Sequence, residues 1–384
     1  MPQHTSLLII GAGPFALAAA AYALEHNIDH LVVGKPMDFW KSNMPKGMYL
    51  RSACDWHLDP MDIHTIELYL QTKDLRPPDV EPLSLDFYLG YAQWFQEQKG
   101  IEPLPVLVHH LDYADDVSRP LTATLDNGDV ISAKNVLLAL GNRYFQNVPE
   151  PYAGLLPPGR YSHTCDFVAL DSLLGKRCLI IGGRQSAFEW AALAREQGAV
   201  TVHVCHRHDT PRFTPSDWSW VNPLVDAIAI NPGWFRNLTA DDKQAINHHM
   251  WLEGRAKLEP WLWPRLDHDT VTLWPNSQVA ACEEASNGDI IVQLDNGQRL
   301  TVDQIILATG YKANVGNLQL LAQGNVLAGL KASNGSPVLD EHFQSSVPGL
   351  YFTGFAASQD FGPFFGFTVA VRASAKIIGA SLVA

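Results

Sequence analysis

A strand, a glycine turn, a helix and a second strand follow one another in residues 5–36, TSLLIIGAGPFALAAAAYALEHNIDHLVVGKP, and this stretch most constrains the fold. The continuous apolar run Leu7–Ile10 predicts a strand buried on both faces. Gly11 permits a tight turn, Gly13 lets the backbone approach a pyrophosphate, and Ala16 still allows close packing of the helix. Because the turn opens an Ala-rich helix whose N-terminus attracts phosphate, we expect a dinucleotide there rather than a purely structural glycine turn.

The end of the second strand departs from this pattern. A strand over residues 31–33 should end in an acidic residue that binds a ribose hydroxyl group. This chain has Gly34 and Lys35 at that point. Recognition of the ribose must therefore be weaker, or come from another segment.

A second unit of the same kind occupies residues 176–207, KRCLIIGGRQSAFEWAALAREQGAVTVHVCHR. The strand 179–181 leads into Gly182, but Arg184 stands where the middle glycine is expected. Arg184 either contacts phosphate through its guanidinium group or weakens the seat of the pyrophosphate by its bulk. Arg207, at the end of the next strand, suits the 2′-phosphate of NADP rather than the bare ribose of NAD; the alternative is a solvated surface charge.

Composition and charge exclude several classes of protein. The chain has 384 residues, enough for two or so domains, and a formal net charge of −13 that argues against nucleic acid or an anionic membrane as the main partner. We find no secretory signal and no apolar run of membrane-spanning length. The five cysteines are scattered and none form a C-x-x-C pair, so we expect a cytoplasmic protein without a redox-active dithiol.

Four further segments carry a family resemblance, in the expected order along the chain. Together with the two glycine turns they resemble class B flavoprotein monooxygenases, and most of all the branch that contains lysine and ornithine N-monooxygenases. Gly34 and Arg184 depart from the family pattern. The segments are FWKSNMPKGMYLRS (39–52), YAGLLPPGRYSHT (152–164), DQIILATGYKANV (303–315) and GLYFTGFAASQDFGPFFGFTVAVRASAKII (349–378).

The resemblance implies an α/β fold with two Rossmann-like dinucleotide-binding domains. A glutathione-reductase-like FAD domain would comprise residues 1–150 and 300–384, with an inserted NADP domain at 151–299. Two similar stretches, DNGDVISAKNVLLALG and DNGQRLTVDQIILATG, each predict a hairpin turn and two strands that end at a crossing between the domains. Seven tryptophans crowd into residues 210–275, which we interpret as a helical insert: a satellite core, a lid, or a contact in a homo-oligomer.

The resemblance also implies an activity. NADPH would reduce FAD, and a flavin C4a-hydroperoxide would oxygenate a small nucleophilic substrate with O₂, most simply by N-hydroxylation of an amine or amino acid. Alternatives are sulfide or Baeyer–Villiger oxygenation, or a flavoprotein NADPH oxidoreductase without oxygen insertion. A degenerate nucleotide-binding sensor is the alternative of another class.

Candidate site residues come from several separated segments. Arg51 is a candidate for stabilising peroxide or binding a substrate carboxylate, with a salt bridge as the alternative, and His57 is a candidate proton donor, with a structural role as the alternative. No pattern of carboxylates or cysteines completes a metal site around the histidines, so no metal is expected. The expected cofactor-binding residues are Gly11, Gly13, Pro14, Phe15, Ala16, Lys35, Trp40, Met48, Leu50, Arg51, Ser52, Gly141, Gly182, Arg184, Gln185, Ser186, Arg207, Thr309, Gly310, Tyr311, Gly354, Gly362, Phe364 and Phe365.

Overall fold

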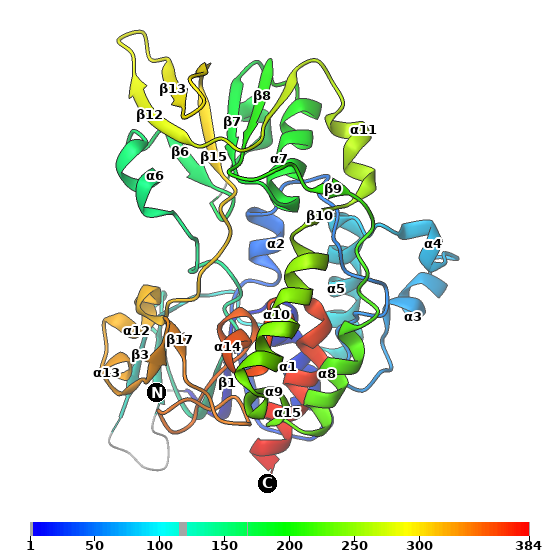
Figure 1. The fold of residues 1–384 in the computed structure, drawn as a ribbon. Coiled ribbons are helices and arrows are strands. Elements are labelled where there is room, and N and C mark those ends of the chain that lie inside the picture. The colour runs from blue at the N-terminus through cyan, green and yellow to red at the C-terminus, as the bar shows by residue number, and fades with distance from the viewer. Residues whose placement is uncertain (1–2, 115–120, 167, 384) are drawn as a thin grey trace.

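Two sheets, each with helices packed against it, form the two ends of the molecule in the computed structural model (Figure 1). The structure describes residues 3–114, 121–166 and 168–383. The predicted domain bounds also include the remaining residues, which lie outside the described part of the chain. The α/β fold with two dinucleotide-binding units, predicted from the sequence, is confirmed. No helix in the described part of the chain is long and apolar enough to cross a bilayer.

The first sheet has the strand order β2-β1-β5-β4-β3, with β18 paired to β5. Strands β2, β1, β5 and β18 run parallel, and β3 and β4 continue the sheet in antiparallel fashion. Helix α1 packs against α15, and both belong to the core of this half. The bounds are β1 (Gln3–Ile10), α1 (Pro14–Glu25), β2 (His30–Val33), β3 (Val108–Tyr113), β4 (Leu121–Leu125), β5 (Val130–Leu138), β18 (Leu350–Phe352) and α15 (Val371–Val383).

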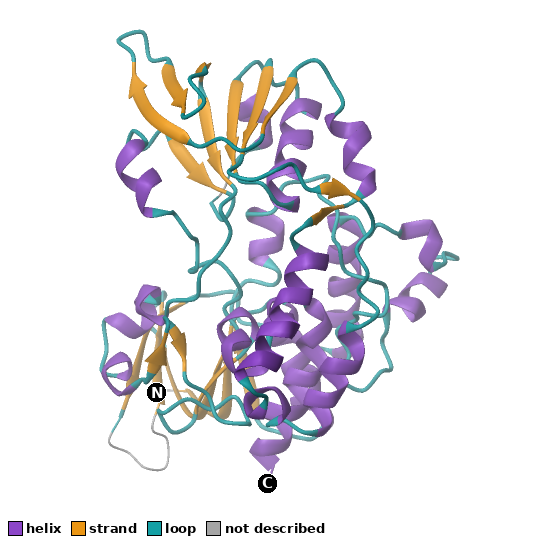
Figure 2. Ribbon diagram, viewed as in Figure 1, coloured by secondary structure: helices purple, strands orange, loops and turns teal. Residues whose placement is uncertain are grey.

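The second sheet has the order β11-β8-β7-β15-β6, with all neighbours parallel, and a three-stranded antiparallel sheet, β12-β13-β14, lies beside it (Figure 2). Helix α7 packs against β7 and β8. Strand β15 lies in this sheet, although the sequence reasoning assigned residues from 300 onward to the first domain. The bounds are β6 (Tyr161–His163), β7 (Arg177–Ile181), α7 (Gln185–Glu196), β8 (Thr201–Cys205), β11 (Val271–Trp274), β12 (Val279–Glu284), β13 (Ile290–Leu294), β14 (Arg299–Val302) and β15 (Gln304–Leu307).

The two Asp-Asn-Gly stretches form hairpin turns as predicted. Gly128 turns the chain between β4 and β5, and Gly297 turns it between β13 and β14, each with a positive φ. The first stretch then continues as the single strand β5. The second is divided at Asp303, whose carboxylate accepts hydrogen bonds from the backbone and guanidinium groups of Arg177 and so separates β14 from β15.

The tryptophan-rich segment folds mainly into helices, and it spans both halves. Helix α8 packs against α15, and α9 packs against α14 and α8, in the lower half of Figure 1; α10 leads back toward the second sheet. Trp218, Trp220 and Trp234 pack against the core of the first half, so this part of the segment extends that core. The bounds are β9 (Arg212–Phe213), α8 (Val221–Ile230), α9 (Trp234–Asn237), α10 (Ala240–Gly254), β10 (Lys257–Leu258) and α11 (Trp263–Leu266).

The remaining elements are short, apart from α5, which packs against α1, α2 and α3. They are α2 (Asp38–Ser42), α3 (Ile66–Gln71), α4 (Pro77–Val80), α5 (Leu85–Lys99), α6 (Glu150–Leu155), α12 (Gln319–Ala322), α13 (Val326–Gly329), β16 (Ala332–Ser333), β17 (Ser336–Pro337) and α14 (Ser358–Phe361), with 3₁₀ turns at Leu170–Leu173, Pro260–Leu262, Val315–Asn317, Gly354–Ala357, Pro363–Gly366 and Thr368–Ala370.

Candidate dinucleotide sites and the contacts between them

The first glycine turn has the geometry that a pyrophosphate requires. Gly11 has a φ of 116°, and a Cβ added to it would lie 2.3 Å from the carbonyl oxygen of Ala139. Gly13 is the N-cap of α1, and a Cβ there would meet no heavy atom within 4 Å. No side chain of the described residues caps this helix, so its first amides are free for a ligand. With Pro14, Phe15 and Ala16, this turn fits the phosphates of FAD.

The structure gives a physical reason for Gly34. Its φ is 148°, and a Cβ on it would lie 3.1 Å from the backbone nitrogen of Ala12 and from the carbonyl carbon of Gly11. A side chain here would be strained by the positive φ and would press on the backbone of the first glycine turn, which disfavours the ribose-binding carboxylate expected from the fingerprint. Lys35 follows as an exposed side chain.

The second turn repeats the construction of the first. Gly182 has a φ of 152°, and its added Cβ would lie 2.3 Å from the carbonyl oxygen of Ala308. Arg184 is the N-cap of α7, with extended backbone angles (φ −123°, ψ 177°) that any residue adopts. The missing glycine therefore introduces no backbone strain, and Gln185 and the exposed Ser186 form the first turn of α7. This turn fits the phosphates of a second dinucleotide.

The side chain of Arg184 reaches the end of helix α10. Its Nη1 donates to the carbonyl oxygen of Arg255 at 2.7 Å, and its guanidinium carbon lies 5.3 Å from the ring centroid of Trp251. Arg207 is exposed directly after β8, at the place where a ribose phosphate is expected. Sequence reasoning identified Arg184 and Arg207 but missed Trp251 and Arg255, because both come from outside the βαβ unit.

The segment expected to cover the flavin lies between the two halves of the molecule. The amide of Tyr49 donates to Oε1 of Glu189, on α7, at 2.5 Å, and the ring of Tyr49 lies 5.1 Å from that of Trp261. Met48 belongs to the core around α7, whereas Leu50 belongs to the core of the first half. Neighbouring residues of this segment are thus anchored in different halves.

Arg51 is fixed to the tryptophan-rich segment. Its Nε donates to Glu259 at 2.9 Å, its Nη1 donates to the carbonyl of Gly254 at 2.7 Å, and its Nη2 donates to Ser216 and to the carbonyl of Glu253. Only 14% of the side chain is exposed. This placement favours the salt-bridge alternative for Arg51 over a guanidinium group free to bind substrate.

Glu189 is a buried acid that sequence reasoning missed. It is 2% exposed, and burial raises the pKa of its carboxyl group to about 8, although the Tyr49 amide and the charges of Arg265 and Arg51 act in the opposite direction. The signal for it in the sequence is a single acidic residue within the apolar run of α7, AFEWAALA.

His57 is buried and bound to the last helix. Its Nε2 lies 2.7 Å from Nη1 of Arg372, on α15, and 3.4 Å from a carboxylate oxygen of Asp62. Burial and the Arg372 charge lower the pKa of His57 to about 4. Because a guanidinium group cannot accept a hydrogen bond, Nε2 is the acceptor and the neutral ring carries its proton on Nδ1. Nδ1 is buried without a hydrogen-bond partner among the described residues.

The two chain crossings between the halves lie side by side. Thr309 donates through its hydroxyl group to the carbonyl of Asn147 at 2.5 Å, and the amide of Asn147 donates to the carbonyl of Gly310 at 3.0 Å. Tyr311 forms an isolated antiparallel bridge with Gln146. Thr309, Gly310 and Tyr311 therefore lie between the halves, and Gly141, with a φ of 62°, lies in the turn that begins the first crossing.

Gly354, in the C-terminal segment 349–378, lies close to Phe15 of the first glycine turn. Gly354 has a φ of 70°, and a Cβ on it would lie 3.5 Å from the ring of Phe15. The side chains of Phe364 and Phe365 are fully buried in the core, whereas Phe367 is 39% exposed. Any flavin contact from Phe364 or Phe365 is therefore limited to their backbone. Three residues of the predicted set remain. Gly362 has a φ of 104°, and the ring of Trp40 stacks on that of Tyr88. The hydroxyl groups of Ser52 and Thr368 share a hydrogen bond of 3.0 Å.

All five cysteines are free, and none is activated. Burial raises the pKa of the Cys165 thiol to about 11 and those of Cys54, Cys178 and Cys205 to about 12, and it raises that of Cys282 as well. A thiol reacts as its thiolate, so these side chains are poor nucleophiles at neutral pH.

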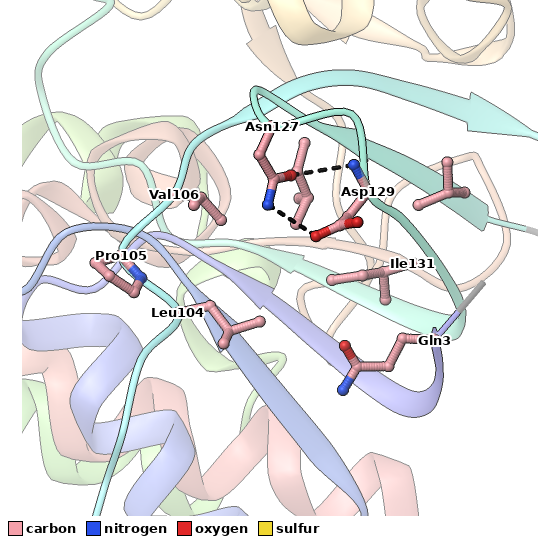
Figure 3. Close-up of a pocket in the computed structure, with 9 residues that line it drawn as sticks. Gln3, Leu104, Pro105, Val106, Asn127, Asp129 and Ile131 are labelled. Atoms are coloured by element: carbon pink, nitrogen blue, oxygen red, sulfur yellow. Dashed lines mark hydrogen bonds between the residues drawn. The ribbon is translucent and has the colours of Figure 1, made fainter. Parts of the chain in front are cut away.

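A surface pocket lies beside the turn between β4 and β5 (Figure 3). It is lined by Gln3 and Ile131, near the starts of β1 and β5, and by Leu104 and Pro105. Two of its polar side chains are paired with each other, since the Asn127 amide donates to the Asp129 carboxylate at 2.7 Å.

Comparisons with known proteins agree with this geometry. The family model "Pyridine nucleotide-disulphide oxidoreductase" matches residues 5–221 and 246–374. The probable indole-3-pyruvate monooxygenase YUCCA9 of Arabidopsis thaliana is 24% identical over 344 residues, which cover 80% of this chain and 75% of that protein.

Solved structures share the whole fold. The ornithine N-hydroxylase of Kutzneria sp. 744, in complex with reduced FAD, NADP⁺ and L-ornithine, aligns with a TM-score of 0.80 at 15% identity and covers 100% of this chain and 99% of its own. L-Lysine 6-monooxygenase of Pseudomonas syringae aligns with a TM-score of 0.74 at 20% identity and covers 99% of both chains.

Proposed function

The chain belongs to the pyridine nucleotide-disulphide oxidoreductase family, and on that premise we propose that it is an FAD-dependent monooxygenase that uses NADPH and O₂ to oxygenate a small nucleophilic molecule. The observation that carries the proposal is the matched pair of glycine turns. Gly11 and Gly182 each end a buried parallel strand, and each lies against a carbonyl oxygen so closely that a Cβ would come to 2.3 Å. Two such turns serve two dinucleotides, one donating hydride to the other.

The cysteines separate this proposal from disulfide reduction, the other chemistry that the family name describes. A disulfide reductase needs an accessible thiolate, usually as one of a pair. Here four of the five thiols are buried, and burial raises the pKa of every one. With no activated thiol to receive them, the electrons pass to a diffusible acceptor, and we take this acceptor to be O₂ because the chain shares its fold with N-hydroxylating monooxygenases.

Bound FAD supplies the redox and oxygen chemistry. The chain's own residues bind and orient the coenzymes and the substrate, and they exclude water from the site. The amides at the start of α1 would hold its pyrophosphate, and those at the start of α7 would hold that of NADPH. We assign Arg51 a positioning role, because its contacts keep the segment 48–52 between the halves. His57, neutral at pH 7, holds its proton on Nδ1 beside the start of α15.

N-hydroxylation of an amine or amino acid is the reaction we favour. Support comes from the full-length structural agreement with ornithine and lysine hydroxylases. Sulfide and Baeyer–Villiger oxygenation are the alternatives. The engagement of Arg51 by Glu259 leaves that guanidinium group unable to clamp a substrate carboxylate, so an amino-acid substrate would need another partner for its carboxylate, and amines and amino acids are both tested.

The test is a product assay under ¹⁸O₂. Purified protein with its bound flavin is incubated with NADPH and, in separate reactions, with diamines, amino acids, sulfides and ketones. The proposal predicts that one class yields a product with one ¹⁸O atom, in amounts that match NADPH consumption. Hydrogen peroxide accounting for all NADPH in every reaction would indicate an oxidase instead.

A further inference from the structure

The C-terminal end of α10 lies next to the second glycine turn. Arg184 begins α7, where the pyrophosphate of a dinucleotide approaches. Its side chain turns away from the βαβ unit and donates to the carbonyl of Arg255 at 2.7 Å, with Trp251 at 5.3 Å. A segment outside the Rossmann-like unit is therefore in direct contact with the residue at the pyrophosphate position.

Two further arginines, Arg207 and Arg255, lie close enough to Arg184 for their charges to act on it, and none of the three has an acidic partner among the described residues. Arg184, Arg207 and Arg255 form no ion pair with any residue that the structure describes. Burial lowers the pKa of Arg184, and the charges of Arg255 and Arg207 lower it further. Like charges held together cost free energy, and a bound anion relieves that cost through charge-assisted hydrogen bonds.

An exposed aromatic ring lies next to these charges. Trp251 is 42% exposed, and the neighbouring Leu252 is 40% exposed. His248 stacks beside the indole with an interplanar angle of 11°, which leaves part of the ring open to solvent. An indole face next to guanidinium groups suits a ligand that combines a planar base with phosphate.

On the basis of the proposed NADPH-dependent function, we propose that Trp251 and Arg255 belong to the coenzyme site and bind the adenosine half of NADPH. Arg255 acts with Arg207 on a phosphate group, and Trp251 packs against the adenosine. The segment between β8 and β11 is then part of the coenzyme site as well as of the core. Neither residue lies in the glycine fingerprint.

Equilibrium binding tests this assignment without relying on turnover. The flavin-loaded protein is titrated by calorimetry with 2′,5′-ADP, which carries only the adenosine half, and with NADP⁺. We expect Arg255→Ala to weaken both ligands about tenfold, as loss of a charge-assisted hydrogen bond does, and Arg255→Lys to restore part of the affinity. We expect Trp251→Ala to weaken both by about threefold to tenfold.

Two matched controls are available. Leu252→Ala removes an equally exposed apolar side chain from the same helix, and Arg299→Ala removes an exposed arginine on β14 that pairs with Glu283. Both should bind as the wild type does. Retained flavin absorbance and an unchanged circular dichroism spectrum establish that the Trp251 and Arg255 variants are folded.

Wild-type affinity in the folded Arg255→Ala and Trp251→Ala variants would overturn the assignment. The failure of the proposed function gives a different result. If the wild type binds 2′,5′-ADP and the two variants do not, but NADPH fails to reduce the bound flavin of the wild type, the binding site is supported and the proposed function is contradicted.

Discussion

Arg51 and Arg184 donate hydrogen bonds to carbonyl groups of consecutive residues, Gly254 and Arg255, at the end of α10, each at 2.7 Å. Arg51 belongs to the segment expected over the flavin, and Arg184 is the N-cap of the helix at the second glycine turn. The last carbonyls of a helix lack partners within it and carry its negative dipole end, so they suit two cations. The end of α10 thereby joins the two candidate sites.

Removing Arg51 should lower the stability of the protein, because it breaks this connection to the end of α10. Arg51→Ala leaves the Glu259 carboxylate and the Gly254 carbonyl group without their donor in a site that is 14% exposed, and we expect the free energy of unfolding to fall by about 3 kcal/mol. Urea denaturation measures the change. The exposed pair of Arg299 and Glu283 is the control, since Arg299→Ala should cost less than about 1 kcal/mol. Equal effects of the two substitutions would contradict the anchoring role.

The two glycines of the first turn should respond differently to alanine. Gly11→Ala puts a Cβ at 2.3 Å from a carbonyl oxygen at a positive φ, so we expect a loss of stability of more than about 2 kcal/mol. Gly13→Ala meets open space in the protein alone, so we expect a folded protein that loses bound flavin, because the new methyl group occupies the approach to the pyrophosphate. Thermal melting and the flavin-to-protein absorbance ratio distinguish the two effects. Full flavin content in Gly13→Ala would show that the pyrophosphate lies elsewhere.

Glu189 should make stability depend on pH in a defined direction. Its pKa in the folded protein is about 8, above the ordinary value of 4.5, so the folded state holds a proton that the unfolded chain has released. The wild type should therefore lose stability as the pH rises from about 4.5 to about 8. Glu189→Gln keeps an acceptor for the Tyr49 amide without this cost. The melting temperature of Glu189→Gln minus that of the wild type should increase as the pH rises over that range. A difference that does not change with pH would contradict burial of the acid.

His57 should act in the opposite pH direction. Its folded-state pKa is about 4, below the ordinary value of 6.5, so the unfolded chain binds a proton that the folded protein does not. Stability should fall as the pH decreases from about 6.5 to about 4, by at most about 3 kcal/mol. His57→Gln retains an acceptor for Arg372 and should lack this decrease. Parallel pH profiles for the two proteins would show that His57 is accessible to protons when folded.

The sequence was sufficient for the two strand–turn–helix units, because each depends on local signals: an apolar run, glycines and a helix start. The Asp-Asn-Gly turns were predictable for the same reason. The place of Arg51 was not predictable, because its partners Glu259 and Ser216 are remote from it in the chain. Glu189 and Trp251 escaped for the same reason: neither lies in a motif, and only the contact between the halves shows their surroundings. Gly34 looked like a defect in the sequence, whereas the structure shows a position with a positive φ, close to the first glycine turn, where a side chain is disfavoured.

The most direct test of the account is anaerobic mixing of the purified protein with NADPH in a stopped-flow spectrophotometer. Because two dinucleotides should bind to one chain with hydride passing between them, we predict that the visible absorbance of bound flavin bleaches at a rate that saturates with NADPH concentration. A colourless protein, or bound flavin that stays oxidised at every NADPH concentration, would contradict the account.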